Sequence, residues 1–176
     1  MKKWFSLLIV VPLIVSAPAT ALAWGPDGHK TVGKLASLFL EANQSTNTLN
    51  RIKQILRQNE NLSGVSIWAD TIKGLPTGPT VTNNDPDTQA FLRDPRNKDH
   101  RNWHFDDLPL DCDSYDACSV APIKFNNPTD VVQMINLCVT TLRSNAANPR
   151  FSKRNALRLL VHLVGDLHQP MHVGSG

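Results

Sequence analysis

The segment from His162 to His172 constrains the fold of this chain more than any other. It reads His162-Leu-Val-Gly-Asp166-Leu-His168-Gln-Pro-Met-His172. His162 and Asp166 are four positions apart, so a helix places them on one face, one turn from each other. The surrounding positions are mostly aliphatic, and an ionisable group buried there must find a partner or lose its charge. A divalent metal ion suits a cluster of histidine and aspartate, so the segment predicts a metal site on a largely apolar helix.

The first 23 residues have the pattern of a secretory signal peptide. Residues 1–3 are a short basic start, an apolar run follows to Val15, and Ala21-Leu-Ala23 resembles a signal-peptidase site. The apolar run is short for a membrane span. We therefore expect a mature chain that begins at Trp24, is secreted or periplasmic, and has no stable association with a membrane.

Charge gives little guidance about partners. The 176 residues carry a formal net charge of +3, from 18 basic and 15 acidic residues. Removal of the signal takes away two of the basic residues, so the mature chain is nearly neutral. The remaining length is enough for one domain with a sizeable core. A local group of basic residues is interpreted as a solvated turn and helix start, not as a phosphate-binding patch. Its members are Arg143, Arg150, Lys153, Arg154 and Arg158.

Apolar residues recur at helical spacing in four segments, which predicts an all-α, multi-helix single domain. The segments are 32–39, 49–56, 131–142 after Asp130, and a helix capped by Ser152 that runs to about His168. Pro170 then ends the last helix. Between Gly74 and His100 the chain is rich in Pro, Gly, Asn and Asp, which predicts a long irregular surface segment.

The three cysteines point to a small disulfide loop and not to a metal site. Export permits disulfides, and Cys112 and Cys118 flank a short polar stretch that they can close into a ring. Cys138 lies on the apolar side of a predicted helix. It is either a buried thiol or the partner of a cysteine that this chain lacks. The spacing of the three does not fit a zinc site.

Two candidate ligands lie near the predicted mature N-terminus. The α-amine and carbonyl of Trp24 can chelate a metal once the amine loses its proton, and a glycine-rich turn brings His29 close to them. The alternative interpretation is that Trp24 packs against the domain and His29 caps the next helix.

Further candidates lie in the middle of the chain. Asp70 follows Trp68-Ala69, and His104 stands between aromatic residues. Each by itself is typical of an ordinary structural residue, but together they offer the mixed nitrogen and oxygen ligands that zinc accepts. For His162 and Asp166 the alternative is a buried histidine–carboxylate pair, which His172 makes less favoured because it follows so closely.

These motifs occur in a single order along the chain, and together they resemble the S1/P1 nuclease family. The motifs are Trp24, Gly28-His29, Trp68-Ala69-Asp70, Trp103-His104-Phe105 and His162-x-x-x-Asp166-x-x-x-x-x-His172. That family comprises zinc-dependent, single-strand-specific nucleases related to bacterial zinc phospholipase C. The resemblance implies a helical fold of the phospholipase C and nuclease type with a three-zinc cluster in a cleft. It also implies a secreted, monomeric endonuclease that hydrolyses single-stranded DNA and RNA to 5′-nucleotides, with 3′-nucleotidase activity in many members.

The resemblance also implies a role for each candidate residue. One zinc ion would be held by Asp70, His104, His162 and Asp166, and Asp70 would also act on the attacking water as the catalytic residue. Asp166 would bridge to a second zinc ion, held by His29 and by the amine and carbonyl of Trp24, and His172 would bind the third. Substrate would be bound by Phe105 stacking on a base, Asp107 hydrogen-bonding to it, and Lys73 near the phosphate.

The chain departs from the family after His172. The family takes two more ligands of the third zinc ion from a later His-x-x-x-Asp pair, and no such pair follows here. We therefore expect residues 24–176 to be the N-terminal part of the nuclease domain, lacking C-terminal helices and binding fewer than three zinc ions. The alternatives are a zinc phospholipase C with the same metal ligands, or an inactive truncated fragment. Phe105 and Asp107 favour nucleic acid over lipid.

Overall fold

The computed structural model describes residues 25–109, 112, 114–118, 129–146 and 149–173. These residues form helices and connecting segments without a β-sheet, which confirms the all-α prediction. The predicted signal peptide and Trp24 lie outside the described residues. Within the described ranges, no helix combines the length and the hydropathy needed to span a membrane.

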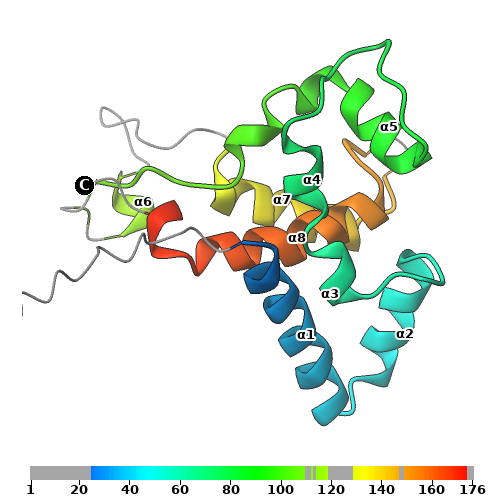
Figure 1. Ribbon diagram of the computed structural model, residues 1–176. Coiled ribbons are helices and arrows are strands. Elements are labelled where there is room, and N and C mark those ends of the chain that lie inside the picture. Colours follow the sequence, from blue (N-terminus) through cyan, green and yellow to red (C-terminus); the bar gives the residue numbers. More distant parts are fainter. Residues whose placement is uncertain (1–24, 110–111, 113, 119–128, 147–148, 174–176) are drawn as a thin grey trace, which may run out of the picture.

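Four of the observed helices correspond to the four predicted ones (Figure 1): α1 (Pro26–Ala42), α2 (Thr46–Ile55), α7 (Val131–Arg143) and α8 (Lys153–Leu167). Shorter α-helices lie between them: α3 (Leu62–Val65), α4 (Trp68–Lys73), α5 (Pro86–Arg93) and α6 (Tyr115–Cys118). Among the described residues, three 3₁₀ turns complete the order: η1 (Pro95–Asn97), η2 (His100–Asn102) and η3 (Pro170–His172).

Helix α8 is the central element of the fold. Its N-terminus is capped by the Ser152 hydroxyl, which accepts a hydrogen bond from the Asn155 amide at 3.2 Å, as the sequence predicted. Helix α7 begins in the same way, with the Asp130 carboxylate accepting from the Gln133 amide at 2.8 Å. Helix α7 packs along α8, and α1, α3, α4 and α5 contact α8 from its other sides. Any side chain on α8 therefore meets several segments of the chain at once.

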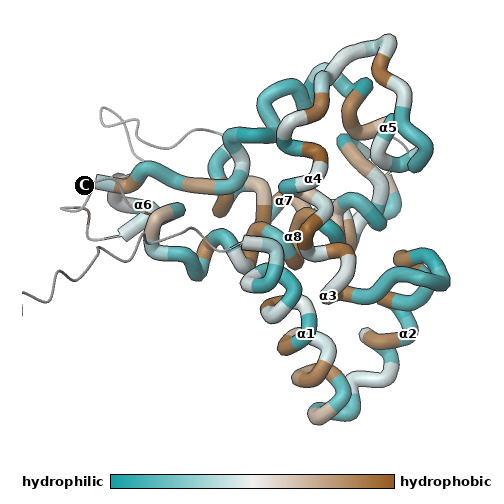
Figure 2. The backbone as a smooth tube through the Cα atoms, in the orientation of Figure 1, coloured by the Kyte–Doolittle hydropathy of each residue, from teal (hydrophilic) through white to brown (hydrophobic). Residues whose placement is uncertain are grey.

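Two hydrophobic clusters hold these helices together. The larger lies between α4, α5, α7 and α8 and contains Phe91, Trp103, Met134 and Leu163. The smaller joins α2 and α3 to α8. In Figure 2 the hydrophobic parts of α4, α7 and α8 meet near the centre of the molecule. Cys138 belongs to the larger cluster as a free, fully buried thiol, and burial raises its pKa to about 12. The Cys112–Cys118 pairing remains a prediction, because the side chain of Cys118 lies outside the described residues.

The segment between Gly74 and His100 is not irregular throughout, so that prediction was wrong for α5 and η1. Helix α5 forms there because Asp85 caps it, accepting from the Asp87 amide at 3.1 Å, and because Pro86 is preorganised for a first helical turn. The helix buries Phe91 and Leu92 in the larger cluster. The polar composition concealed a short helix that tertiary packing stabilises.

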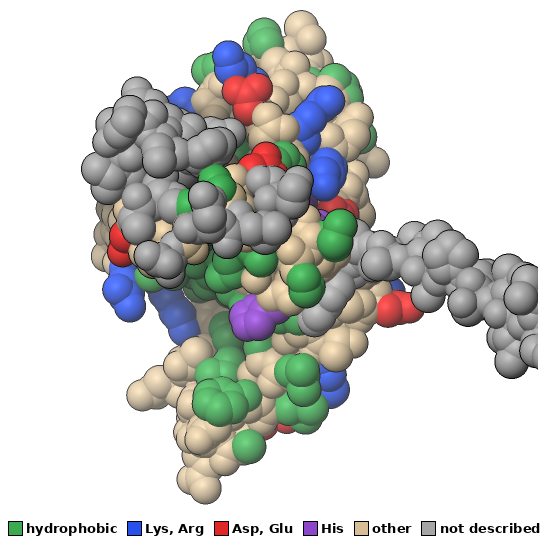
Figure 3. Space-filling model, turned by 90° about the vertical axis from the view of Figure 1, so that its left-hand side faces the viewer, with side chains coloured by type: hydrophobic (Ala, Val, Ile, Leu, Met, Phe, Trp, Pro, Cys, Tyr) green, Lys and Arg blue, Asp and Glu red, His purple; other side chains and the backbone are tan. Residues whose placement is uncertain are grey.

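Helix α1 turns much of its apolar side outward. Leu35, Leu38 and Phe39 are 59%, 45% and 68% exposed, and the space-filling view shows hydrophobic side chains gathered on this face (Figure 3). The buried residues of α1 are instead His29 and Gly33. The apolar spacing therefore predicted the helix correctly, but these residues lie outside both core clusters of the described chain.

Two arginines of α8 form a buried ion-pair cluster with three carboxylates, namely Arg154 and Arg158 with Glu60, Asp85 and Asp87. Arg158 donates to Glu60 at 2.6 Å and to Asp85 at 2.9 Å, and Arg154 donates to Asp85 and Asp87 at 2.9 Å. The two arginines are only 7% and 4% exposed, so the prediction of a solvated helix start was wrong for them. The cluster ties α8 to the segment before α3 and to the start of α5.

This ion-pair cluster should make stability depend on acidic pH. Burial raises the pKa of Glu60, but hydrogen bonds from Arg154, Arg57 and Arg158 outweigh it and lower the pKa from 4.5 to about 2. A carboxyl with a depressed pKa stabilises the fold above its unfolded value, and this contribution, about 3 kcal/mol, is lost as the pH falls from 4.5 towards 2. Urea unfolding of the Glu60→Gln variant should therefore be less pH-dependent over that range than unfolding of the parent.

The matched control is Glu41→Gln at the exposed end of α1, which should keep the pH dependence of the parent. Equal slopes for the parent and Glu60→Gln would show that the ion-pair cluster does not stabilise the fold through Glu60.

Candidate metal centre

The described candidate ligands converge from five parts of the chain. His29 comes from α1, Asp70 from α4, His104 from the segment after η2, and His162 and Asp166 from α8. His172, at the end of η3, joins them. All the predicted ligands within the described residues therefore lie around one point, and Trp24 is the predicted ligand outside them.

Asp166 lies at the centre of this group. Its Oδ2 is 2.9 Å from His104 Nδ1 and 3.0 Å from His162 Nε2. Its Oδ1 faces the other way, 3.4 Å from His29 Nε2 and 3.2 Å from His172 Nδ1. Each carboxylate oxygen thus has its own pair of imidazoles. This is the arrangement expected of a carboxylate that bridges two cations.

Asp70 completes the group from the solvent side. Its Oδ1 is 3.7 Å from His162 Nε2 and 3.8 Å from His104 Nδ1, and its Oδ2 is 3.8 Å from His29 Nε2. The Asp70 side chain is 39% exposed, whereas that of Asp166 is 2% exposed. Asp70 therefore offers a carboxylate that both the ligand group and a molecule from solvent can reach.

The spacing of the donor atoms fits zinc. Two candidate ligand sets have all their donor atoms within 4.8 Å of one another: His29, Asp70 and His162, and His104, His162 and Asp166. Zn–N and Zn–O bonds of about 2.0–2.2 Å in tetrahedral geometry place neighbouring donors about 3.3–3.6 Å apart. The separations here run from 2.9 to 3.8 Å. In addition, His162 Nε2 and His104 Nδ1 face each other at 2.9 Å, which requires a proton or a cation between two nitrogen lone pairs.

Backbone carbonyls orient two of the imidazoles. His162 Nδ1 donates to the Ser66 carbonyl at 2.6 Å, which leaves Nε2 of the neutral ring as the electron-pair donor facing Asp166. His172 Nδ1 donates to the His104 carbonyl at 2.9 Å. The His29 ring stacks on His162 with centroids 3.8 Å apart. Sequence reasoning missed Ser66, because a backbone carbonyl that accepts a hydrogen bond leaves no signature in residue type.

Electrostatics favour the protonation states that metal ligands need. Burial lowers the pKa of His29 and of His104, and the neighbouring His162 lowers both further. Burial alone would raise the pKa of Asp166, but the adjacent His104 and His162 rings hold it well below its usual range. Neutral imidazoles around an ionised carboxylate are the form in which these groups coordinate a metal.

Comparison with known proteins shows which family this chain belongs to. The sequence profile described as S1/P1 Nuclease matches residues 24–176. The chain belongs to the S1/P1 nuclease family. It is 26% identical to Endonuclease 3 of Arabidopsis thaliana, with 99% of this chain aligned to 51% of that protein. It is 28% identical to Nuclease S1 of Aspergillus oryzae over 91% of this chain and 49% of that protein.

The chain thus spans about half the length of the curated relatives that it matches. No solved structure matches the chain significantly. Membership of the S1/P1 nuclease family confirms the resemblance drawn from the sequence, whereas the role of each site residue in this chain remains a proposal.

The substrate-binding residues inferred from the S1/P1 resemblance lie close to the ligands. Lys73 ends α4, and its charge is near enough to His104 to contribute to the lowered pKa of that ring. Phe105 is 37% exposed directly after His104, and Asp107 is exposed two residues further on. His168 takes no part among the described contacts of the centre, since it is exposed and its Nδ1 donates to the Val164 carbonyl at 2.7 Å.

Sequence reasoning about the S1/P1 site also missed Asp106, which is 3% exposed. Neither carboxylate oxygen has a hydrogen-bond partner among the described residues. Burial raises the pKa of Asp106 to about 6, with smaller contributions from Asp130 and Asp107. Its amide donates to the His172 carbonyl at 2.7 Å, so the backbone of Asp106 helps to hold η3 against the ligand segment.

Gly165, inside the His162-x-x-x-Asp166 motif, should be essential for the position of His29. A Cβ at residue 165 would lie 2.8 Å from His29 Nδ1, so Gly165→Ala should push the ring away from Asp166. We expect the zinc affinity of the variant, measured by competition with a chromogenic chelator, to fall by about 10–100-fold. Gly74→Ala is the control, because a Cβ there meets nothing within 4 Å. Unchanged zinc affinity in Gly165→Ala would show that His29 is not a ligand.

Proposed function

We propose that this chain is a zinc-dependent nuclease that hydrolyses phosphodiester bonds of single-stranded nucleic acid to 5′-nucleotides, acting as a secreted or periplasmic monomer. The observation that carries the proposal is the position of Asp166, whose two oxygens face two separate pairs of imidazoles while Asp70 closes the group from solvent. Family membership supports the same chemistry.

The distances between donor atoms support the ligand assignment that the family resemblance implies. Asp70, His104, His162 and Asp166 would hold one zinc ion, since their donor atoms approach one another at 2.9–3.8 Å. The other oxygen of Asp166 and His29 would hold a second ion, together with the amine and carbonyl of Trp24 after signal removal. His172, whose Nδ1 lies 3.2 Å from the same oxygen of Asp166 and donates to the His104 carbonyl, is proposed as a ligand of a third ion through its other ring nitrogen.

Bound zinc supplies Lewis acidity, which lowers the pKa of water and stabilises the negative charge of the phosphate in the transition state. The residues of the chain would direct that chemistry. Asp70, which is partly exposed, would orient the attacking water and accept its proton. Lys73 would hold a phosphate oxygen beside the ligand group.

Preference for a single strand would come from the segment after His104. The exposed ring of Phe105 would stack on a base, and Asp107 would accept a hydrogen bond from its edge. Base–aromatic stacking contributes about 1–3 kcal/mol per base and tolerates any sequence. A base inside a duplex is already paired and stacked, so only an unpaired strand offers it readily.

The decisive experiment measures release of acid-soluble 5′-nucleotides from denatured and duplex DNA. The purified chain should degrade denatured DNA, lose this activity on metal depletion, and regain it with zinc but not with magnesium. Activity that survives chelation would contradict the proposal, as would equal rates on duplex DNA. The same preparations are offered phosphatidylcholine vesicles, since release of phosphocholine without nucleotides would assign the site to a phospholipase C.

A further inference from the structure

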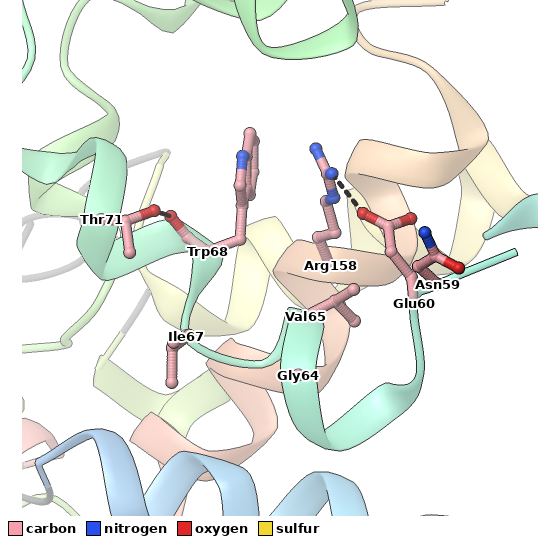
Figure 4. A pocket seen from close by; sticks show the side chains of 8 residues that line it. All are labelled: Asn59, Glu60, Gly64, Val65, Ile67, Trp68, Thr71 and Arg158. Carbon is pink, nitrogen blue, oxygen red and sulfur yellow. Dashed lines mark hydrogen bonds and ion pairs between the residues drawn. The ribbon is translucent and has the colours of Figure 1, made fainter. Parts of the chain in front are cut away.

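Asp106 is a buried acidic side chain that the proposed metal centre does not use. It is 3% exposed, and neither of its carboxylate oxygens has a hydrogen-bond partner among the described residues. The carboxylate of Glu60, which lines a pocket between α3, α4 and α8, shows the usual arrangement, because it accepts from Arg158 at 2.6 Å (Figure 4). An unpaired buried carboxylate is costly, so Asp106 indicates a ligand that the described part of the chain does not supply.

Backbone hydrogen bonds place Asp106 beside the start of α7. The amide of Val131 donates to the carbonyl of Phe105 at 3.3 Å, so residues 105–106 lie against residues 130–131. The carboxylate of Asp130, which is 1% exposed, is near enough to act on Asp106 electrostatically. Two buried carboxylates therefore lie near each other, and a positive ion between them would compensate the charge of both.

The groups around Asp106 do not compensate its charge. Two of the first three amides of α7 are already used, one by the Phe105 carbonyl and one by the Asp130 carboxylate. The hydroxyl of Tyr115 donates to Asp130 at 2.9 Å. The amide of Asp107 lies close to the Asp106 carboxylate without forming a hydrogen bond to it. The charged side chains that act on Asp106 are those of Asp130 and Asp107, which carry the same charge.

The donor atoms near this position are oxygens, which suit calcium better than zinc. They belong to the carboxylates of Asp106 and Asp130 and to the backbone carbonyls of Phe105 and His172, the second of which accepts from the Asp106 amide at 2.7 Å. Calcium takes about 6–8 oxygen ligands in flexible geometry, and carboxylates and carbonyls supply them. Zinc prefers nitrogen and sulfur, and magnesium demands a nearly ideal octahedron and keeps several waters, which a buried carboxylate does not favour.

We propose that Asp106 and Asp130 form a calcium site, separate from the zinc centre, which joins the segment after His104 to the start of α7. Because the Asp106 amide also donates to the His172 carbonyl, the ion would help to hold two segments that carry proposed zinc ligands. Two carboxylates make a weak site, with a Kd of about 0.1–1 mM, as in extracellular calcium-binding modules. The inference does not depend on the proposed nuclease function.

Thermal unfolding of the zinc-loaded protein tests this site. Calcium chloride at about 10 mM should raise the Tm of the parent by about 3–10 °C, because an ion that binds only the folded state stabilises it, and magnesium chloride should raise it much less. In Asp106→Asn the shift caused by calcium should fall below about 1 °C, since the amide carries no charge. The matched control is Asp27→Asn at the exposed start of α1, which should keep the shift of the parent.

A further variant and a direct measurement show where calcium binds. Calcium can also bind carboxylates of the zinc centre, so Asp166→Asn should keep the calcium shift if the ion lies at Asp106, and loss of the shift there would assign the ion to the zinc centre. Equilibrium dialysis of the zinc-loaded parent with radioactive calcium should find about one ion per chain, and this measurement needs no variant to fold. Absence of bound calcium in the parent, or an unchanged calcium shift in Asp106→Asn, would overturn the proposal.

Discussion

The Asp166→Asn variant should lose zinc binding and nuclease activity together. The amide keeps the size of the side chain but has one oxygen and no charge, so it cannot serve both pairs of imidazoles that the two carboxylate oxygens now face. Removal of a group that only orients a ligand costs about 10–100-fold in affinity, and a shared ligand should cost more than about 100-fold. Elemental analysis of purified protein should find less than one zinc ion per chain.

A thermal readout separates this result from simple misfolding. Chelation should lower the Tm of the parent, because an ion that binds only the folded state stabilises it. It should leave the Tm of Asp166→Asn nearly unchanged. Glu41→Gln, which alters an exposed carboxylate at the end of α1, should behave as the parent does. A zinc-replete Asp166→Asn protein with normal activity would remove Asp166 from the centre.

Gly33→Ala should destabilise the fold more than other glycine substitutions in its helices. Here α1 crosses α3 so closely that a Cβ would lie 2.4 Å from the Leu62 carbonyl oxygen and 2.8 Å from the Ser63 Cα. These are backbone atoms, so no side chain can rotate away to make room. Forcing the two helices apart should cost about 2–3 kcal/mol, although alanine is favoured over glycine in a helix interior by about 1 kcal/mol.

Gly64→Ala is the matched control, since its Cβ would meet only the Asn61 side chain at 3.5 Å. Urea unfolding should show Gly64→Ala to be as stable as the parent or slightly more so, and Gly33→Ala to be clearly weaker. The zinc affinity of Gly33→Ala should also fall, because displacement of α3 moves the Ser66 carbonyl away from His162. Equal stability of the two variants would mean that the helices separate at little cost.

The parts of this fold that sequence reasoning predicted are local. Ser152 and Asp130 begin helices because their side chains cap amides three residues later, and this depends only on neighbouring residues. The same holds for His162 and Asp166, whose spacing places them on one face of a helix. Helix α5 was missed because its polar composition resembles that of a loop. The burial of Phe91 and Leu92 in the core stabilises the helix instead.

The parts that were missed depend on partners far along the chain. Arg154 and Arg158 were predicted to be solvated because their partners are distant in sequence. Glu60 lies 94 residues before Arg154, and Asp85 lies 73 residues before Arg158. Asp70 and His104 were weak candidates by themselves, and the ordered resemblance to a family brought them into the site. Only the folded structure brings these residues close to their partners, and rules based on sequence spacing do not predict such contacts.

The face of α8 that carries Arg154, Arg158, His162 and Asp166 at intervals of four residues limits how this protein can be altered. Insertion or deletion of a single residue between Arg158 and His162 would turn one half of this row by about 100° relative to the other. Either the arginines would lose their carboxylates or the imidazoles would leave the centre. We therefore expect length changes in natural and engineered variants to be confined to the loops that flank α8, and a transplant of this site to another scaffold to need the whole helix in its original register.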